Sequence, residues 1–181
     1  MDLVEQGIDV AVRIGELPDS SLLARRVGTS SRVLVAHRSY LRLLPKGTKA
    51  PKVPEDLARH NCVVYTEVPM RKAWGFTAGP GAAQPVGTKR TVHVEGNLQT
   101  NSSEVIRASI LSGMGIGYSP EWLFDREIAS GELQQLLPDW QTVTMPIHLV
   151  SPQERRHSAK VKAFAEHVGK RMAFGRDGGD L

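Results

Sequence analysis

The sequence has a single cysteine, Cys62, so an internal disulfide is excluded and a disulfide-stapled secreted scaffold is not indicated. No apolar run approaches the roughly 20 residues that a membrane-spanning helix needs. The start, Met1 to Glu5, has neither the basic nor the apolar character of a signal peptide. Together these absences predict a cytoplasmic protein with no membrane partner.

The composition is that of a folded protein. Of the 181 residues, 40% are apolar and 23% charged, which is enough for one domain or two small lobes with a sizeable core. The net charge is +4, but the basic pairs Arg25-Arg26, Lys89-Arg90 and Arg155-Arg156 are scattered along the chain. Scattered cations favour a solvated surface over direct contact with DNA, which needs clustered Lys and Arg.

Strand patterns and helix patterns alternate along the chain. Strands are expected at 8–14, 22–27, 32–36, 62–65, 116–118 and 146–150, with a hairpin formed by 74–76 and 91–94. Helices are expected at 38–44, 54–59 and 102–112, from a Ser119 cap to Gly131, and at the end of the chain, where Val161 to Met172 contain an apolar stripe. This alternation predicts an α/β sandwich, not a helical bundle or a barrel.

The first residues predict the end of a helix, closed by Gly7 in a left-handed conformation. They lead directly into the 8–14 strand, which is of a buried type that usually has parallel neighbours earlier in the sequence. We therefore expect the beginning of the fold to be missing from this chain.

Two motifs suggest chemistry but fit it poorly. Gly113-Met114-Gly115-Ile116-Gly117 follows a helix and has no phosphate-binding lysine behind it, so these glycines are expected to cap a helix and allow close packing. Ser119 lacks the glycine two residues later that a nucleophile elbow needs, because residue 121 is Glu. We expect Ser119 to be a helix cap.

The remaining reactive side chains also lack a catalytic setting. Cys62 begins an apolar strand and is expected to pack in the core. The six histidines show no metal-ligand spacing, and no pair of catalytic carboxylates stands out. The sequence therefore predicts no catalytic residue, no metal site, no cofactor and no enzyme activity.

Small polar residues lie where predicted elements end. Arg13 and Gly15 end one strand, and Thr66 follows another. Asn101, with Glu104 three residues on, is expected to cap the helix that begins at Ser102. In open α/β sheets, ligands bind beyond the carboxyl ends of strands, where loops and free helix N–H groups converge. This pattern favours a ligand-binding cleft, although every helix start needs a cap with or without a ligand.

Six segments stand out by their order and spacing. They are DLVEQGIDVAVRIGELPDSSLLARRVG, RVLVAHRSYL, PEDLARHNCVVY, IRASILSGMGIGYSPEWLF, GELQQLLPDW and MPIHLVSPQERRHSAKVKAFAEHV. Together they resemble the effector-binding domain of LysR-type transcriptional regulators. The resemblance covers residues 2 to 172 and depends on their order and spacing. It implies a periplasmic-binding-protein-like α/β fold of two lobes, with residues 1–35 plus 143–174 as lobe I, 36–142 as lobe II and 175–181 as a tail.

The resemblance also implies a site and partners. A small-molecule effector would bind between the lobes, and the family's cleft residues correspond to Arg13, Ile14, Gly15, Thr66, Asn101, Ser102, Tyr118 and Pro120. The helix start at Asn101 suits an anionic or hydroxylated effector. The family implies a homo-oligomer, a dimer or tetramer, that reaches DNA only through a winged helix-turn-helix missing from this chain.

Other interpretations stay open at this point. Compared with the family, the first lobe lacks two strands, and the resulting unpaired edge predicts association with another chain. A solute-binding protein of similar fold would need a signal sequence and two complete lobes. A small hydrolase using Ser119 or Cys62, or a DNA-binding module using the basic pairs, is a weaker alternative.

Overall fold

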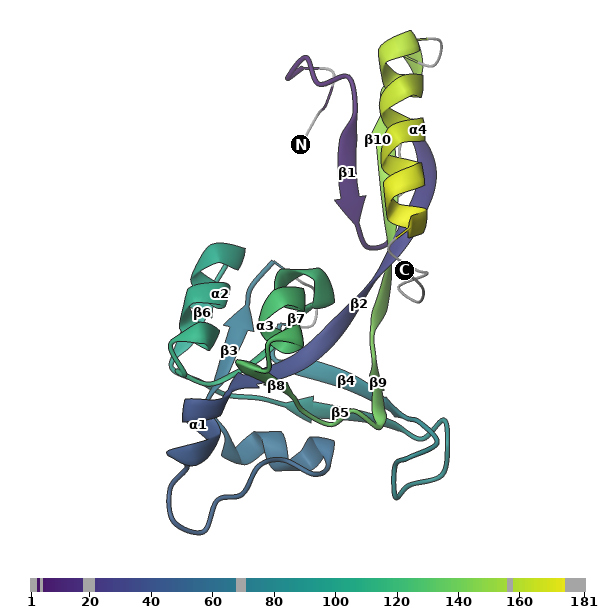
Figure 1. Ribbon diagram of the computed structural model, residues 1–181. Helices are drawn as coiled ribbons and strands as arrows, with labels where there is room; N and C mark the ends of the chain where they lie inside the picture. Colours follow the sequence, from purple (N-terminus) through teal and green to yellow (C-terminus); the bar gives the residue numbers. More distant parts are fainter. Residues whose placement is uncertain (1–2, 4, 18–21, 68–70, 156–157, 175–181) are drawn as a thin grey trace. The chain divides into compact units, whose positions relative to one another are not determined.

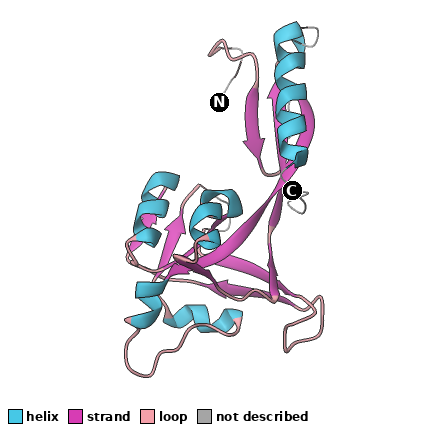
Figure 2. Cartoon of the chain, in the orientation of Figure 1, coloured by secondary structure: helices cyan, strands magenta, loops and turns pink. Residues whose placement is uncertain are grey.

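The computed structural model describes residues 3, 5–17, 22–67, 71–155 and 158–174 (Figure 1). The chain divides into two compact units, unit 1 with residues 1–30 and 144–181 and unit 2 with residues 31–143. Both units combine strands and helices (Figure 2). The predicted mixed α/β class is therefore confirmed.

Unit 1 is a small sheet covered by one helix. Its strands lie in the order β1 (Ala11–Ile14), β10 (Thr144–Ser151) and the first half of β2 (Leu23–His37). The short η3 (Gln153–Arg155) and the long α4 (Ala159–Phe174) follow β10. Apolar side chains of β2 and β10 pack with Ala165 of α4 to form the core of this unit, which includes Val27, Ile147 and Leu149.

The first strand differs from its prediction. It begins at Ala11 instead of residue 8, and its apolar side chains Val12 and Ile14 are 48% and 46% exposed. Their partners Leu149 and Ile147 of β10 lie on the same face of the sheet and are buried with Ala165 of α4. The described residues thus cover this face at β10 but leave it exposed at β1. Gly7 has φ +64 as expected for a left-handed turn, while the residues before it form a turn or lie outside the described residues.

The two strands expected at 22–27 and 32–36 are a single strand. β2 runs without a break for 15 residues and belongs to both units. The residues at 28–30 were expected to interrupt it, but Gly28 does not adopt a positive φ and the strand continues through it. Extended pairing on both halves of β2 outweighs the local turn tendency of this segment.

Unit 2 contains two sheets. The main one has the order β2, β7 (Ile116–Pro120), β3 (Cys62–Tyr65) and β6 (Leu98–Thr100), with β8 (Leu133–Gln135) also paired to β2. The second has the order β5 (Lys89–His93), β4 (Ala73–Ala78) and β9 (Trp140–Thr142). The predicted hairpin is confirmed, because Trp74 of β4 pairs with Val92 of β5.

The main sheet of unit 2 is covered on both faces. Its helical elements are α1 (Arg38–Arg42), η1 (Pro54–Arg59), α2 (Ser103–Leu111), η2 (Glu121–Leu123) and α3 (Asp125–Ala129). Alternate residues of β2 point to opposite faces. Leu34 packs with the aromatic side chains of the second sheet, whereas Val33 and Val35 pack with Ile106 and Ile110 of α2.

Several helix predictions in unit 2 need correction. Residues 54–59 form a 3-10 helix, and the cap of α2 is Ser102 and not Asn101. Ser119 does not cap a helix: it lies in β7, is 4% exposed, and pairs with Val33 of β2. The segment from Ser119 to Gly131 therefore splits into the end of a strand and two short helices. Among the helices that the structure describes, none is long and apolar enough to cross a membrane.

The glycines of 113–117 have the structural role expected of them. Gly113 has φ +77 directly after α2. A Cβ atom at Gly115 would collide with the backbone carbonyl of Asn61, and one at Gly117 would lie 2.9 Å from the Ile110 side chain. These glycines allow β7 to pack closely against its neighbours, in agreement with the helix-cap and packing interpretation.

Candidate functional site

One edge of the main sheet in unit 2 collects the polar residues that the sequence singled out. β3 is parallel to β6 and to β7, so the carboxyl ends of these three strands lie at the same edge. Arg32 of β2 pairs with Pro120 of β7. Continuing the register of β3 with β7 and β6 places Thr66 level with Pro120 and with Asn101. Arg32, Pro120, Thr66 and Asn101 thus form a row across four neighbouring strands, which we call the edge row.

The β6 end of the edge row is held by hydrogen bonds to Thr100. The Thr66 N–H donates to the carbonyl of Thr100 at 2.9 Å, and the Ser102 N–H donates to the Thr100 hydroxyl at 3.1 Å. The Asn101 side chain is exposed beside them. This geometry brings Thr66, Asn101 and Ser102 together, as the sequence predicted.

The hydroxyl of Ser102 is already used within α2. It accepts from the Val105 N–H at 3.3 Å and donates to the Glu104 carboxylate at 2.8 Å. Hydrogen bonds from the Glu104 backbone N–H and from Ser102 lower the pKa of Glu104, which is therefore ionised at neutral pH. A negative charge thus stands beside the β6 end of the edge row.

Tyr118 is brought to the same region, but its side chain is part of the core. It is 7% exposed, and its ring stacks on Trp74 with centroids 5.1 Å apart. Its hydroxyl donates to the Gly75 carbonyl at 3.0 Å and accepts from the Val143 N–H at 3.1 Å. Little of the ring is left for other contacts, because Trp74 stacks on it and the Arg32 guanidinium lies over it.

Arg32 is the member of the edge row that sequence reasoning missed. Its Nη1 donates to the Tyr118 carbonyl at 2.8 Å, and its guanidinium carbon lies 5.3 Å from the Tyr118 ring centroid. Burial lowers the pKa of Arg32, while Tyr118 and Tyr65 raise it. Within the described part of the chain, no carboxylate forms an ion pair with it. The usable signal was a charged residue directly before the apolar run Val33–Ala36, on the same side of the strand as Leu34.

The remaining predicted site residues lie in unit 1. Arg13 and Ile14 are exposed on β1, where Arg13 pairs with His148 of β10. Gly15 has φ +115, which only glycine adopts easily, and its N–H donates to the Pro146 carbonyl at 2.9 Å. The glycine is required by this turn at the end of the strand.

The reactive side chains lack the surroundings that catalysis needs. Cys62 is completely buried, and burial raises the pKa of its thiol to about 12. Ser119 is buried in β7 and has no histidine among the hydrogen-bond partners found in the described residues. In the same residues, no three His, Cys, Asp or Glu side chains gather as a metal site would require.

A family model described as LysR substrate binding domain matches residues 1–173. The chain belongs to this family. Its fold is accordingly the periplasmic-binding-protein-like α/β fold of LysR regulatory domains, as the resemblance implied. The chain is 34% identical over 173 residues to the HTH-type transcriptional regulator PtxR of Pseudomonas aeruginosa, a match that covers 93% of this chain and 52% of PtxR.

Solved structures agree with this LysR family assignment. The regulatory domain of CrgA, a LysR-type regulator from Neisseria meningitidis, has a TM-score of 0.75 and 29% identity, covering 93% of this chain and 78% of that one. Full-length AphB from Vibrio cholerae has a TM-score of 0.74 and 27% identity, and the match covers 94% of this chain and 54% of AphB. The chain spans about half the length of the curated regulators that it matches: 54% of an HTH-type regulator from Haemophilus influenzae and 52% of PtxR.

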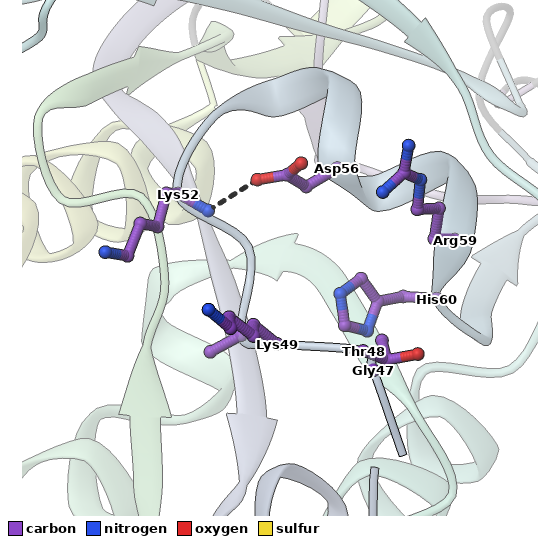
Figure 3. A pocket seen from close by; sticks show the side chains of 8 residues that line it. Gly47, Thr48, Lys49, Lys52, Asp56, Arg59 and His60 are labelled. Atoms are coloured by element: carbon purple, nitrogen blue, oxygen red, sulfur yellow. Dashed lines mark hydrogen bonds between the residues drawn. The ribbon is translucent and has the colours of Figure 1, made fainter. Parts of the chain in front are cut away.

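This LysR substrate binding domain also has a basic pocket of about 290 Å³, formed by η1 and the residues before it (Figure 3). Its charged side chains include Lys49, Lys52 and Arg59, all exposed. Asp56 also lines it and accepts from the Lys52 N–H at 2.9 Å (Figure 3). His60 is buried and held by the Tyr40 hydroxyl at 3.1 Å. The Asp56 carboxylate and the His60 ring already have hydrogen-bond partners within the protein, so we favour the edge row as the functional site.

Proposed function

We propose that the edge row of unit 2 binds a small-molecule effector, and that binding controls transcription by the longer LysR-type regulator to which such a domain belongs. The observation that carries this proposal is the alignment of Arg32, Pro120, Thr66 and Asn101 across four adjacent strands. Ligands of open α/β sheets bind at such an edge. The family description and the regulator names of the relatives support the same function.

We further propose that the two compact units correspond to the two lobes that the resemblance implies. Arg13, Ile14 and Gly15 of unit 1 then contribute to effector binding together with Thr66, Asn101, Ser102, Tyr118 and Pro120 of unit 2. Tyr118 contributes by holding Arg32 with its backbone carbonyl and ring, because its hydroxyl is occupied. If Arg13→Ala leaves the affinity for every bound compound unchanged, unit 1 does not contribute to effector binding.

In this proposal the chain makes and breaks no covalent bond. The effector acts by its preference for one conformation over another, and a coupling of about 1–3 kcal/mol is typical for such regulation. The regulator works as a homo-oligomer, a dimer or tetramer, and reaches DNA through a helix-turn-helix outside this chain. A cytoplasmic location follows because its target is DNA. Light scattering that shows only monomers at high protein concentration would contradict the oligomer.

A ligand screen tests the binding function. Carboxylates, aromatic compounds and amino acids are added to the chain, and the melting temperature is followed, because a compound that binds only the folded state raises it. Each hit is titrated against Thr66→Val and Asn101→Ala, both of which we expect to weaken binding about tenfold by loss of hydrogen bonds.

Asn97→Ala is the matched control for this screen. Asn97 is also an exposed asparagine beside β6, but it precedes the strand, at the end away from the edge row. We expect its removal to leave the affinity unchanged. If neither Thr66→Val nor Asn101→Ala changes the affinity for the hits, binding at the edge row is refuted. It is also refuted if Asn97→Ala reduces the affinity as much as they do.

A further inference from the structure

The Arg32 side chain is a cation in an unusual position for this molecule. Among the described Lys and Arg residues of unit 2, all others are either exposed or paired with a carboxylate. The half-buried examples are Lys72, paired with Glu95, and Arg107, paired with Glu127. Arg32 alone in that group is half-buried and has no carboxylate partner.

We propose that Arg32 is the specificity residue that binds an acidic group, a carboxylate or a phosphate, of the effector. This inference rests on the proposed function, since it assumes that the edge row holds the ligand. A cation withdrawn from water is stabilised by an anion, and the planar fork of a guanidinium matches the two oxygens of a carboxylate or phosphate. The effector supplies the charge that the protein does not.

The side chain of Arg32 is oriented for this role. One N–H is fixed on the Tyr118 carbonyl, and the guanidinium lies over the Tyr118 ring, which leaves its other N–H groups for a ligand. The described residues contain a few buried side-chain atoms without a hydrogen-bond partner, but none of them is an Arg32 nitrogen. The remaining N–H groups of Arg32 therefore reach solvent. The fixed contacts hold the guanidinium in place before a ligand arrives, which reduces the entropy lost on binding.

The charges along the edge row also give the ligand a direction. Glu104 stands at the β6 end, where its carboxylate contacts the Ser102 hydroxyl, and it repels an anion there. Arg32 stands at the β2 end of the same row. An effector with one acidic group therefore binds with that group over β2 and β7 and its neutral hydrogen-bonding part toward Thr66 and Asn101.

The test compares anions with neutral molecules of nearly the same shape. Benzoate, succinate and inorganic phosphate are titrated by calorimetry at constant ionic strength, alongside benzamide and succinamide. We expect at least one anion to bind the unmodified chain more tightly than its amide. Arg32→Gln should weaken that anion about tenfold or more, as for a lost charge-assisted hydrogen bond, and leave the amide unchanged. Comparing the affinity for phosphate with the affinities for benzoate and succinate shows which acidic group is preferred.

Two further variants keep the result interpretable. Arg32→Lys retains the charge without the fork, so we expect a severalfold loss for carboxylates even if Arg32→Gln does not fold. Arg59→Gln removes an exposed arginine of the basic pocket in Figure 3 and should change nothing. Circular dichroism confirms that each variant is folded.

The outcomes separate the two proposals. If Thr66→Val weakens anion binding but Arg32→Gln and Arg32→Lys do not, Arg32 is not the anion partner while the edge row remains the site. If Arg32→Gln weakens the binding of an anion and of its amide equally, Arg32 has only a structural role and the inference is overturned. If only Arg59→Gln weakens anion binding, the anion binds in the basic pocket and the inference is overturned. If none of the five compounds binds the unmodified chain, the same comparison is made with the anionic hits of the ligand screen and their amides, and equal affinity for anion and amide there would overturn the inference.

Discussion

The hydroxyl group of Tyr118 makes a sharp test of how unit 2 is held together. It donates to the Gly75 carbonyl in β4 and accepts from the Val143 N–H, which lies just after β9. Tyr118→Phe removes both hydrogen bonds but keeps the ring, which stacks on Trp74 and lies 5.5 Å from Phe76. The change therefore isolates the polar contribution of this side chain.

The size of the effect follows from the two groups that lose a partner. A fully buried unpaired backbone group costs about 1–3 kcal/mol. Gly75 is half-buried and Val143 is 43% exposed, so water can replace part of each bond and the lower end of that range applies. We expect Tyr118→Phe to reduce the free energy of unfolding by about 2 kcal/mol at pH 7, measured by urea denaturation followed by circular dichroism.

The pH dependence gives a second measurement of the same hydroxyl. Burial raises the pKa of Tyr118, partly offset by the hydrogen bond from Val143 and by the charge of Arg32. A raised pKa means that the folded state prefers the protonated phenol. Its contribution is fully present below the unfolded value of about 10 and is lost as the pH rises through the folded pKa. The stability difference between the two proteins should therefore shrink above about pH 10.

Tyr65→Phe is the matched control. Tyr65 is half-buried on the neighbouring strand β3, and its hydroxyl has no hydrogen bond among the described residues. Its removal should change stability by less than about 0.5 kcal/mol. Equal effects of Tyr65→Phe and Tyr118→Phe, or a Tyr118→Phe variant as stable as the unmodified chain, would refute the role assigned to this hydroxyl.

Two other predictions concern packing. Cys62, with its buried thiol and a pKa of about 12, should resist Ellman's reagent at pH 8 until urea unfolds the chain, and fast modification of the folded protein would contradict this. Gly117→Ala should cost about 1–3 kcal/mol in urea denaturation because its Cβ would lie 2.9 Å from Ile110, whereas Gly169→Ala in α4 meets open space and should gain up to about 1 kcal/mol. A stabilising Gly117→Ala would show that close packing does not explain this glycine.

Local sequence signals predicted the elements that depend on a few neighbouring residues. The strand Cys62–Tyr65 has its predicted bounds, because an apolar, partly β-branched run between polar residues has few alternatives. The α2 helix was placed within one residue, with Gly113 at its end, because caps and glycines act over one turn. The hairpin of β4 and β5 was also found, although its register was not.

Features that depend on distant partners were missed. Ser119 and Pro120 have the sequence of a helix start, but β7 pairs with β2 up to Pro120, so the strand extends through both residues. Arg32 was missed for the same reason. A charged residue before an apolar run marks it only weakly, and its position beside Tyr118 depends on a contact between residues 86 apart in the sequence.

The hydrogen bonds around Arg32 also join the two points at which the backbone passes from unit 2 to unit 1. β2 enters unit 2 at residue 31, and the chain leaves it after Val143. The Arg32 carbonyl accepts from the Thr142 hydroxyl at 2.5 Å, and Val143 is bound by the Tyr118 hydroxyl, whose own backbone carbonyl holds the guanidinium. A displacement of Arg32 is therefore felt at both polypeptide connections together, because one network of hydrogen bonds ties residues 32, 142 and 143 to each other.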